Sequence, residues 1–104
     1  MLKCAICKVA DGEATLVRDH DHETGFIRGI LCDLCNSWLG VHESNIKRAR
    51  LGRKLRGRRR FIEWLAKYKT TIDQYLKTAH TGYRYRMGEN VHEWAARAGI
   101  EEST

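Results

Sequence analysis

The four cysteines of this 104-residue chain form two matched pairs near its N-terminus. Each pair has two residues between its cysteines, and residues 8–31 separate the pairs. Two intervening residues let both thiolates of a pair point at one centre, and four thiolates match the tetrahedral coordination of zinc. The sequence therefore predicts one structural zinc ion per chain, with the ligands Cys4, Cys7, Cys32 and Cys35.

Two other uses of these cysteines are open. A pair of disulfides would need an oxidising compartment, but the sequence shows neither an export signal nor an apolar run long enough to span a membrane. A redox-active pair is the other alternative, although such pairs rarely occur as two matched copies. We therefore expect an intracellular protein without a membrane partner. Since four protein ligands leave no open position, the zinc would hold the ends of residues 8–31 together rather than catalyse a reaction.

Inside this loop, two acids and two histidines occur in succession as Asp19, His20, Asp21 and His22, and Asn36 directly follows the last cysteine. Carboxylate and amide oxygens are ligands suited to Mg²⁺. A neutral imidazole can activate water near neutral pH. These residue types suit phosphodiester hydrolysis, whereas the four-residue run by itself could also be a polar hairpin tip in solvent.

The neighbouring residues predict the elements that must position these side chains. Residues 14–18 and 26–31 have strand composition, and residues 23–25 supply a turn, so the acid and histidine run would lie in the connection of a hairpin. A short helix over 33–39 would follow, with Asp33 as its N-cap and Gly40 as its end. This arrangement would place Asn36 near the base of the hairpin, facing Asp19 and His20, in a small α+β fold.

The order of these motifs resembles the recombination endonuclease VII family of bacteriophages, which belongs to the His-Me finger (HNH-type) nucleases. The residues that carry the resemblance are Cys4-x-x-Cys7, Asp19-His20-Asp21-His22, Gly25, Arg28-Gly29-x-Leu31-Cys32-x-x-Cys35-Asn36 and Leu39-Gly40. The resemblance covers about residues 4–40. It implies a zinc-stapled ββα-metal finger and a setting inside a phage-infected or prophage-bearing bacterium.

The resemblance also implies roles for single residues. Asp19 and Asn36 match the ligands of a catalytic Mg²⁺ (or Mn²⁺), His20 matches the general base, and His22 a supporting histidine. Leu39 stands where the family pattern suggests an acid. Glu43 could compensate from the next turn, but the break expected at Gly40 would separate it from the site.

The implied activity is that of a metal-dependent DNA endonuclease. In this mechanism His20 takes a proton from water, and the metal contacts a non-bridging oxygen and the departing 3′ oxygen. Branched or Holliday-junction DNA is the implied substrate. The alternatives are an HNH nicking or homing-type endonuclease on linear duplex and a non-catalytic zinc module that binds DNA or RNA.

A basic run follows the predicted finger. The chain has a formal net charge of +6, and nine of the fourteen residues 47–60 are Lys or Arg, with no acid among them. Such a block could be a solvated helix face, but beside a nuclease-like motif it favours contacts with phosphates that do not depend on sequence. The predicted DNA-binding residues are Lys47, Arg48, Arg50, Arg53, Lys54, Arg56, Arg58, Arg59 and Arg60, together with Arg18 and Arg28 beside the motif.

The rest of the chain has helical spacing of apolar residues. Helices are expected from Ser44 to Leu51, from Arg53 through Ala66, from Thr71 to Ala79, and from Asn90 to Gly99. Residues 1–42 would thus form the finger and residues 43–104 a basic, mainly α-helical extension. Because so short a chain has little core of its own, the helices could pair across a two-fold axis as a homodimer. The alternative is a monomer whose helices pack on its own finger.

Overall fold

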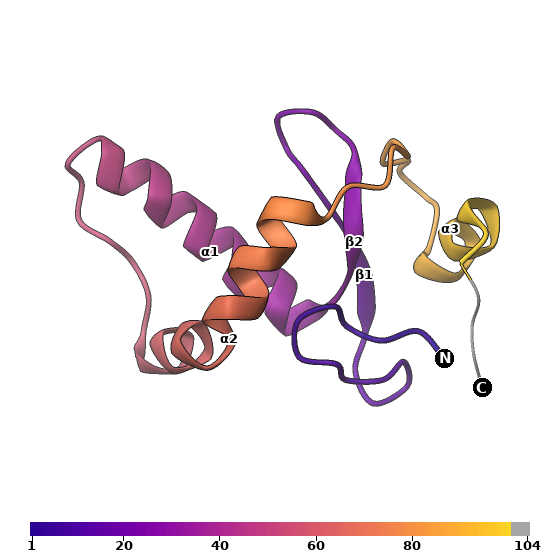
Figure 1. Cartoon of the computed structure of the whole chain (residues 1–104), viewed down its shortest axis with the longest axis horizontal. Helices are drawn as coiled ribbons and strands as arrows, with labels where there is room; N and C mark the ends of the chain where they lie inside the picture. The colour runs from indigo at the N-terminus through magenta and orange to yellow at the C-terminus, as the bar shows by residue number, and fades with distance from the viewer. Residues whose placement is uncertain (101–104) are drawn as a thin grey trace.

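Residues 1–100 form a two-stranded sheet and three helices in a computed structural model. Along the chain these are β1 (Leu16–His20), β2 (Ile27–Cys32), α1 (Asp33–Arg50), α2 (Arg59–Thr78) and α3 (Val91–Ala98). The hairpin lies in the middle, with α1 and α2 on one side and α3 on the other (Figure 1). This confirms the small α+β class; residues 101–104, which end the predicted extension, lie outside the described residues.

The hairpin is antiparallel and contains one bulge. Leu16 pairs with Cys32 and Asp19 with Gly29, but His20 pairs with Ile27, so Arg28 is the extra residue on β2. The turn begins at Asp21, whose carboxylate accepts hydrogen bonds from the backbone amides of residues 23 and 24. The prediction that placed Asp19 and His20 in the connection is therefore wrong. Both residues belong to β1, because the bulge lets the ladder continue to His20.

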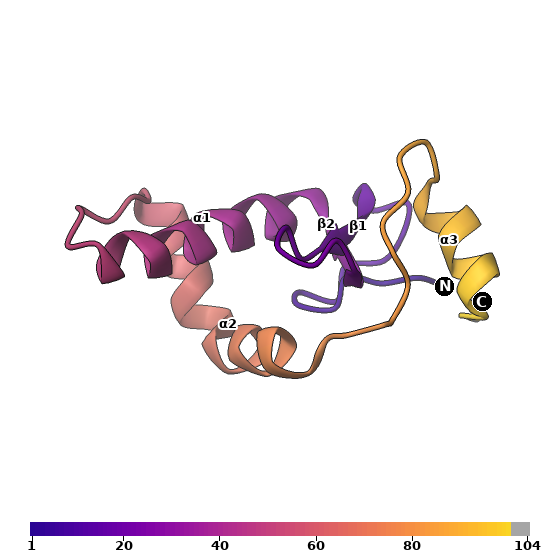
Figure 2. The same cartoon turned by 90° about the horizontal axis from the view of Figure 1, so that it is seen from above.

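The outer edge of β2 is hydrogen-bonded to loops of the same chain. The amide of Ile27 donates to the carbonyl of Tyr83, and the Thr81 hydroxyl donates to the carbonyl of Ile27. Further along β2, the amide of Ala5 donates to the carbonyl of Ile30. The N-terminal loop and the segment before α3 are thus both attached to this edge, and Figure 2 shows the chain between α2 and α3 passing beside the hairpin.

Helix α1 is longer than predicted. Its N-cap is Cys32 rather than Asp33, and it continues through Gly40 to Arg50. A glycine inside a helix costs only about 1 kcal/mol relative to alanine. Leu39, just before Gly40, is completely buried, and Glu43, just after it, forms an ion pair with Arg28. These two contacts hold the helix together at Gly40. The helix break predicted at Gly40 is therefore wrong, and so is a helix start at Ser44.

Helix α2 starts later than predicted and is continuous. Gly57 has φ of 133°, which a residue inside a helix cannot adopt, so residues 53–58 form a loop and the helix begins at Arg59. The side chain of Asn45 holds this loop by hydrogen bonds to the backbone of Arg56. No second helix starts at Thr71; the only departure from helical geometry is a kink at Tyr68 (φ −109°, ψ 15°).

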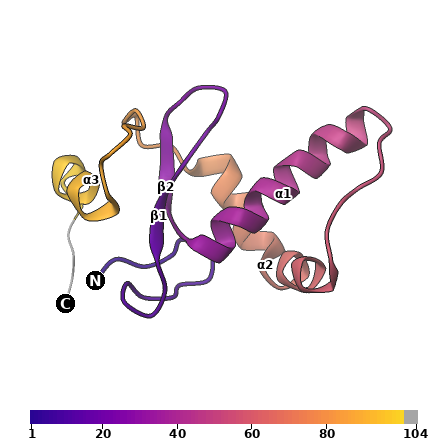
Figure 3. The ribbon, with the colours of Figure 1, turned by 180° about the vertical axis from the view of Figure 1, so that it is seen from behind.

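The last helix matches its prediction. Asn90 caps α3 in a reciprocal capping box with Glu93, and Gly99 ends it with φ of 74°. One core joins all the elements, as its buried members come from the N-terminal loop, β1, β2, α1, α2 and α3. The boundary expected at residue 42 lies inside α1. Figure 3 shows the long loop between α1 and α2 at the end of the molecule far from α3. No helix among residues 1–100 has the length and apolar character needed to cross a membrane.

Candidate metal centre and active site

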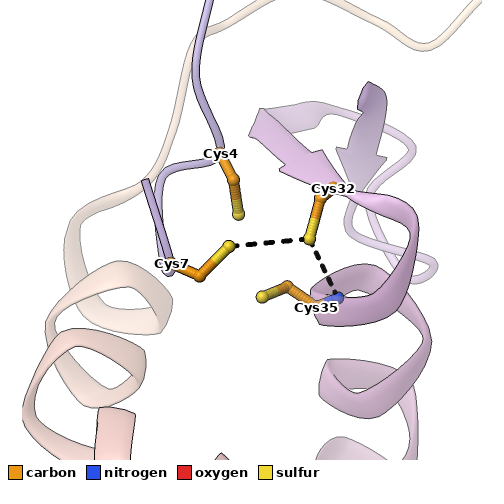
Figure 4. Close-up of side chains that lie close together, drawn as sticks. All are labelled: Cys4, Cys7, Cys32 and Cys35. Carbon is orange, nitrogen blue, oxygen red and sulfur yellow. Dashed lines mark hydrogen bonds between the residues drawn. The ribbon is translucent and has the colours of Figure 1, made fainter. Parts of the chain in front are cut away.

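The four cysteines converge on one point. Figure 4 shows their thiol groups directed toward one another, from the N-terminal loop, the end of β2 and the first turn of α1. Their sulfur atoms all lie within 4.8 Å of one another, and those of Cys7 and Cys32 are 3.7 Å apart. A tetrahedron with zinc–sulfur bonds of about 2.3 Å has edges of about 3.8 Å. The cluster can therefore hold a metal ion, and its size and donors fit zinc.

Several N–H groups point at these sulfur atoms. The amide of Ile6 donates to Cys4 at 3.4 Å, and the amide of Cys35 donates to Cys32 at 3.4 Å. From α2, the indole N–H of Trp64 donates to the sulfur of Cys35 at 3.3 Å. Such donors stabilise negative charge on thiolates and orient them.

The cluster already favours ionisation of one thiol. Hydrogen bonding from the Cys35 thiol, together with nearby backbone amides, lowers the pKa of Cys4 to about 4. The pKa of Cys35 is raised, because its proton is held by Cys4 and because it is buried. A thiolate is the form that binds metal, so the cluster is prepared to receive a cation.

Asp19 is a buried carboxylate with three donors. Only 5% of the residue is exposed, which is unusual for an acid. Arg28 donates two hydrogen bonds to it, from Nε to Oδ2 at 2.8 Å and from Nη2 to Oδ1 at 3.0 Å. The hydroxyl of Tyr75 donates to Oδ2 at 2.8 Å. These contacts fix the plane of the carboxylate.

Arg28 links Asp19 to α1. Its guanidinium also donates two hydrogen bonds to Glu43, at 2.8 and 2.9 Å, and only 9% of its side chain is exposed. Burial alone would lower the pKa of Arg28, but its bonds to Glu43 and Asp19 outweigh burial and raise it. The expectation that Glu43 is separated from the site is wrong, because α1 does not break at Gly40. One cation thus bridges two carboxylates, which leaves one net negative charge.

His20 ends β1 beside Asp19. Its ring stacks on Tyr85, with centroids 4.3 Å apart, and lies 4.5 Å from the ring of His22. No hydrogen bond joins either ring nitrogen of His20 to another side chain or backbone group in residues 1–100. Desolvation and the neighbouring His22 lower the pKa of His20, so its ring is neutral at pH 7 and can accept a proton.

Asn36 lies in the first turn of α1 and is half-buried. It shares a helix face with Gly40 and Glu43, and Glu43 reaches the hairpin through Arg28. Within residues 1–100, no side chain or backbone group is hydrogen-bonded to its amide group. Further along this face, an open cleft of about 320 Å³ separates α1 from the turn and is lined by Asp21, His22, Glu23, Gly40, Glu43 and Lys47.

The predicted DNA-binding residues fall into two groups. Most of the basic run is exposed, across the end of α1, the loop at 51–58 and the start of α2; Arg48 is half-buried. Arg18 and Arg28 are instead buried in ion pairs of the same chain. Arg18 has 7% of its side chain exposed, pairs with Glu89 at 3.3 Å, and packs over the ring of Tyr85.

Two tyrosines at this site were not predicted. Tyr75 occupies an apolar position of a helix, and nothing near it in the sequence connects it with Asp19. Tyr85 belongs to a basic and aromatic segment, which the sequence alone leaves open as a linker or a DNA contact. Both reach the hairpin only through tertiary packing, so no local pattern reports their contacts with Asp19 and His20.

Comparisons with known proteins identify relatives. The sequence model described as recombination endonuclease VII matches residues 1–71. The Gene 59 protein of Mycobacterium phage D29 is 47% identical over 38 residues, and that of Mycobacterium phage L5 is 49% identical over 37 residues. These alignments cover 36% and 35% of this chain but only 23% of each relative. No solved structure matches significantly. Because the family match extends over more than half of its length, this chain belongs to the recombination endonuclease VII family.

Proposed function

We propose that this chain is a divalent-metal-dependent DNA endonuclease that hydrolyses phosphodiester bonds in branched DNA, such as Holliday junctions. The observation that carries the proposal is a neutral histidine with unbonded ring nitrogens at the end of β1, next to a buried carboxylate, in a chain of the endonuclease VII family. In this proposal β1, β2 and the first turns of α1 are the ββα-metal finger of an HNH-type nuclease.

The four cysteines would hold a structural zinc ion. They leave no open position for a substrate, and they fix the N-terminal loop against the junction of β2 and α1. The zinc would therefore set the angle between the hairpin and α1, on which the positions of His20 and Asn36 depend.

The donor types of Asp19 and Asn36 suit a catalytic Mg²⁺ or Mn²⁺. Asp19 and Asn36 are the residues that would hold it, since both offer hard oxygen donors and the Asn36 amide has no other partner in the described part of the chain. The net negative charge of Asp19, Glu43 and Arg28 favours a cation. When bound, the ion would supply Lewis-acid stabilisation of charge on the phosphate.

His20 would be the general base. A free ring nitrogen would accept a proton from the attacking water, and the stack with Tyr85 would keep the ring in one orientation. His22, which lies against His20, would support this orientation. The expected products carry a 5′ phosphate and a 3′ hydroxyl.

The exposed basic run at 47–60 would hold the DNA. The run contains no acidic residue. It extends over a loop and two helix ends rather than along one recognition helix. This arrangement suits backbone contacts that follow the shape of the DNA. In this proposal residues 1–42 carry out the hydrolysis and residues 43–104 bind the DNA.

We also propose that the chain acts as a homodimer, which would place two active sites on two strands of a junction. Four apolar side chains are exposed around the loop between α1 and α2, namely Ile46, Leu51, Leu55 and Ile62. Ile46, Leu55 and Ile62 line a hollow of about 430 Å³ together with Ala49 and Leu65. Exposed apolar groups of this kind mark protein contacts. Light scattering on purified protein measures the mass in solution.

The function is tested by incubating the zinc-loaded protein with a four-way junction and with linear duplex of the same sequence, with and without Mg²⁺. We expect Mg²⁺-dependent cutting of the junction. His20→Ala should fold and keep its zinc but stop cutting, whereas His80→Ala, which changes a histidine outside the site, should cut normally. Unchanged cleavage by His20→Ala would contradict the assignment of the base.

The same experiment separates the alternatives. Equal cutting of linear duplex would indicate a nicking or homing-type endonuclease. Binding of DNA without cutting at any Mg²⁺ concentration would indicate a non-catalytic zinc module. One observation favours this alternative, namely the ion pair between Asp19 and Arg28.

A further inference from the structure

Helix α2 reaches the candidate active site through one side chain. Tyr75 is buried, and its hydroxyl donates to Oδ2 of Asp19 at 2.8 Å. It lies 56 positions after Asp19, outside residues 1–71 that match the family model. The contact is therefore a property of how this chain packs, beyond the segment that carries the family motifs.

The hairpin makes room for this tyrosine at Gly29. Gly29 is the cross-strand partner of Asp19, and such partners point to the same face of a sheet. A Cβ atom at Gly29 would lie 3.1 Å from both a ring carbon and the hydroxyl oxygen of Tyr75, closer than ordinary packing allows. The missing side chain thus provides the space in which the ring approaches the carboxylate.

The donors leave Asp19 with little freedom. A carboxylate has about four lone-pair positions. Arg28 and Tyr75 occupy both positions of Oδ2, and Arg28 occupies one position of Oδ1. One position on Oδ1 remains.

We propose that Tyr75 is a positioning residue for Asp19, which it holds so that Oδ1 alone is presented to a divalent ion. This inference rests on the proposed function, because it assigns Asp19 as a ligand of the catalytic ion. An ion held there would therefore bind Asp19 through one oxygen only. Without the hydroxyl, Oδ2 would also be free to bind, and the ion would sit more tightly but in the wrong place for the phosphate.

The test is Tyr75→Phe, which removes one oxygen and keeps the ring. Tyr68→Phe is the matched control, since Tyr68 lies on the same helix with its ring against Trp64 and away from Asp19. Mn²⁺ binding to the zinc-loaded protein is measured without DNA, from the electron paramagnetic resonance of free Mn²⁺. Thiolate sites do not favour Mn²⁺, so the zinc cluster does not interfere.

We expect Tyr75→Phe to bind Mn²⁺ about three- to tenfold more tightly, as the loss of one competing hydrogen bond implies, and to cut junction DNA at least about tenfold more slowly. Tyr68→Phe should match the unchanged protein in both. Unchanged or weaker Mn²⁺ binding by Tyr75→Phe would overturn the positioning role.

A second variant keeps the proposal testable if Tyr75→Phe does not fold. Gly29→Ala leaves Tyr75 intact, but its added methyl group displaces the tyrosine ring from Asp19. It should therefore also tighten Mn²⁺ binding. An unchanged Mn²⁺ affinity would overturn the proposal. If the unchanged protein neither binds Mn²⁺ nor cuts DNA, the proposed function itself fails. If it does both and the two variants behave identically to it, only the role of Tyr75 fails.

Discussion

Replacing Arg28 by methionine should destabilise the protein strongly, because it leaves Asp19 as an unpaired charge in the interior. Arg28→Met keeps a long apolar side chain but removes both hydrogen bonds that the guanidinium donates to this carboxylate. Among residues 1–100, Tyr75 would be its one remaining donor. Since only 5% of Asp19 is exposed, water cannot take the place of the lost donors without local opening.

The size of the effect follows from these contacts. Hydrogen bonds to a charged group contribute about 1.5–3 kcal/mol each, so the loss of two predicts about 3–6 kcal/mol. Breaking a buried ion pair typically costs about 3–5 kcal/mol, which agrees. Glu43→Gln should cost less than about 1 kcal/mol, because 36% of the Glu43 side chain is exposed and water can solvate what remains.

The free energy of unfolding is measured by urea denaturation in buffer with excess zinc, followed by circular dichroism. A loss of 3 kcal/mol corresponds to a fall in melting temperature of about 12 °C or more for a chain of this size. The double variant Asp19→Asn with Arg28→Met tests the cause, since it also removes the stranded charge and should recover at least about 2 kcal/mol. A cost below about 1 kcal/mol for Arg28→Met, or no recovery in the double variant, would refute the reasoning.

Three further predictions concern other parts of the chain. Gly40→Ala should raise the free energy of unfolding, measured by urea denaturation, by up to about 1 kcal/mol. The position is inside α1, and an added Cβ atom would meet no neighbouring group within 4 Å. A lower free energy of unfolding would mean that α1 needs flexibility at Gly40. Trp64→Phe removes the indole N–H that donates to Cys35 and should weaken zinc binding about three- to tenfold in competition with a chelator. Changing the three arginines at 58–60 to glutamine should reduce the slope of log affinity for DNA against log salt by about 2 to 3; an unchanged slope would place the phosphate contacts elsewhere.

The parts of the fold that were predicted correctly depend on local chemistry. The cysteine spacing predicted the cluster, and the strand and turn composition predicted the hairpin to within two residues. Asn90 and Gly99 predicted both ends of α3, because caps are made by residues that are neighbours in sequence.

The errors arose where tertiary contacts override a local preference. Gly40 resembles a helix end, but the buried Leu39 and the Glu43 ion pair carry α1 past it. The interaction of Tyr75 with Asp19 joins residues far apart in sequence, and no periodicity encodes it. Arg28, for which phosphate contact stays a prediction, is the extra residue of the bulge and is paired with two carboxylates of its own chain.

The hydrogen bonds along the outer edge of β2 also protect that edge from pairing with a strand of another chain. A two-stranded ribbon would normally offer its open flank as a template for another chain. Here the outward groups of Ile27 and Ile30 are already bonded to residues 81–83 and to Ala5. Another copy of this chain therefore cannot add a strand along the β2 edge without first displacing residues 81–83 or Ala5 from it.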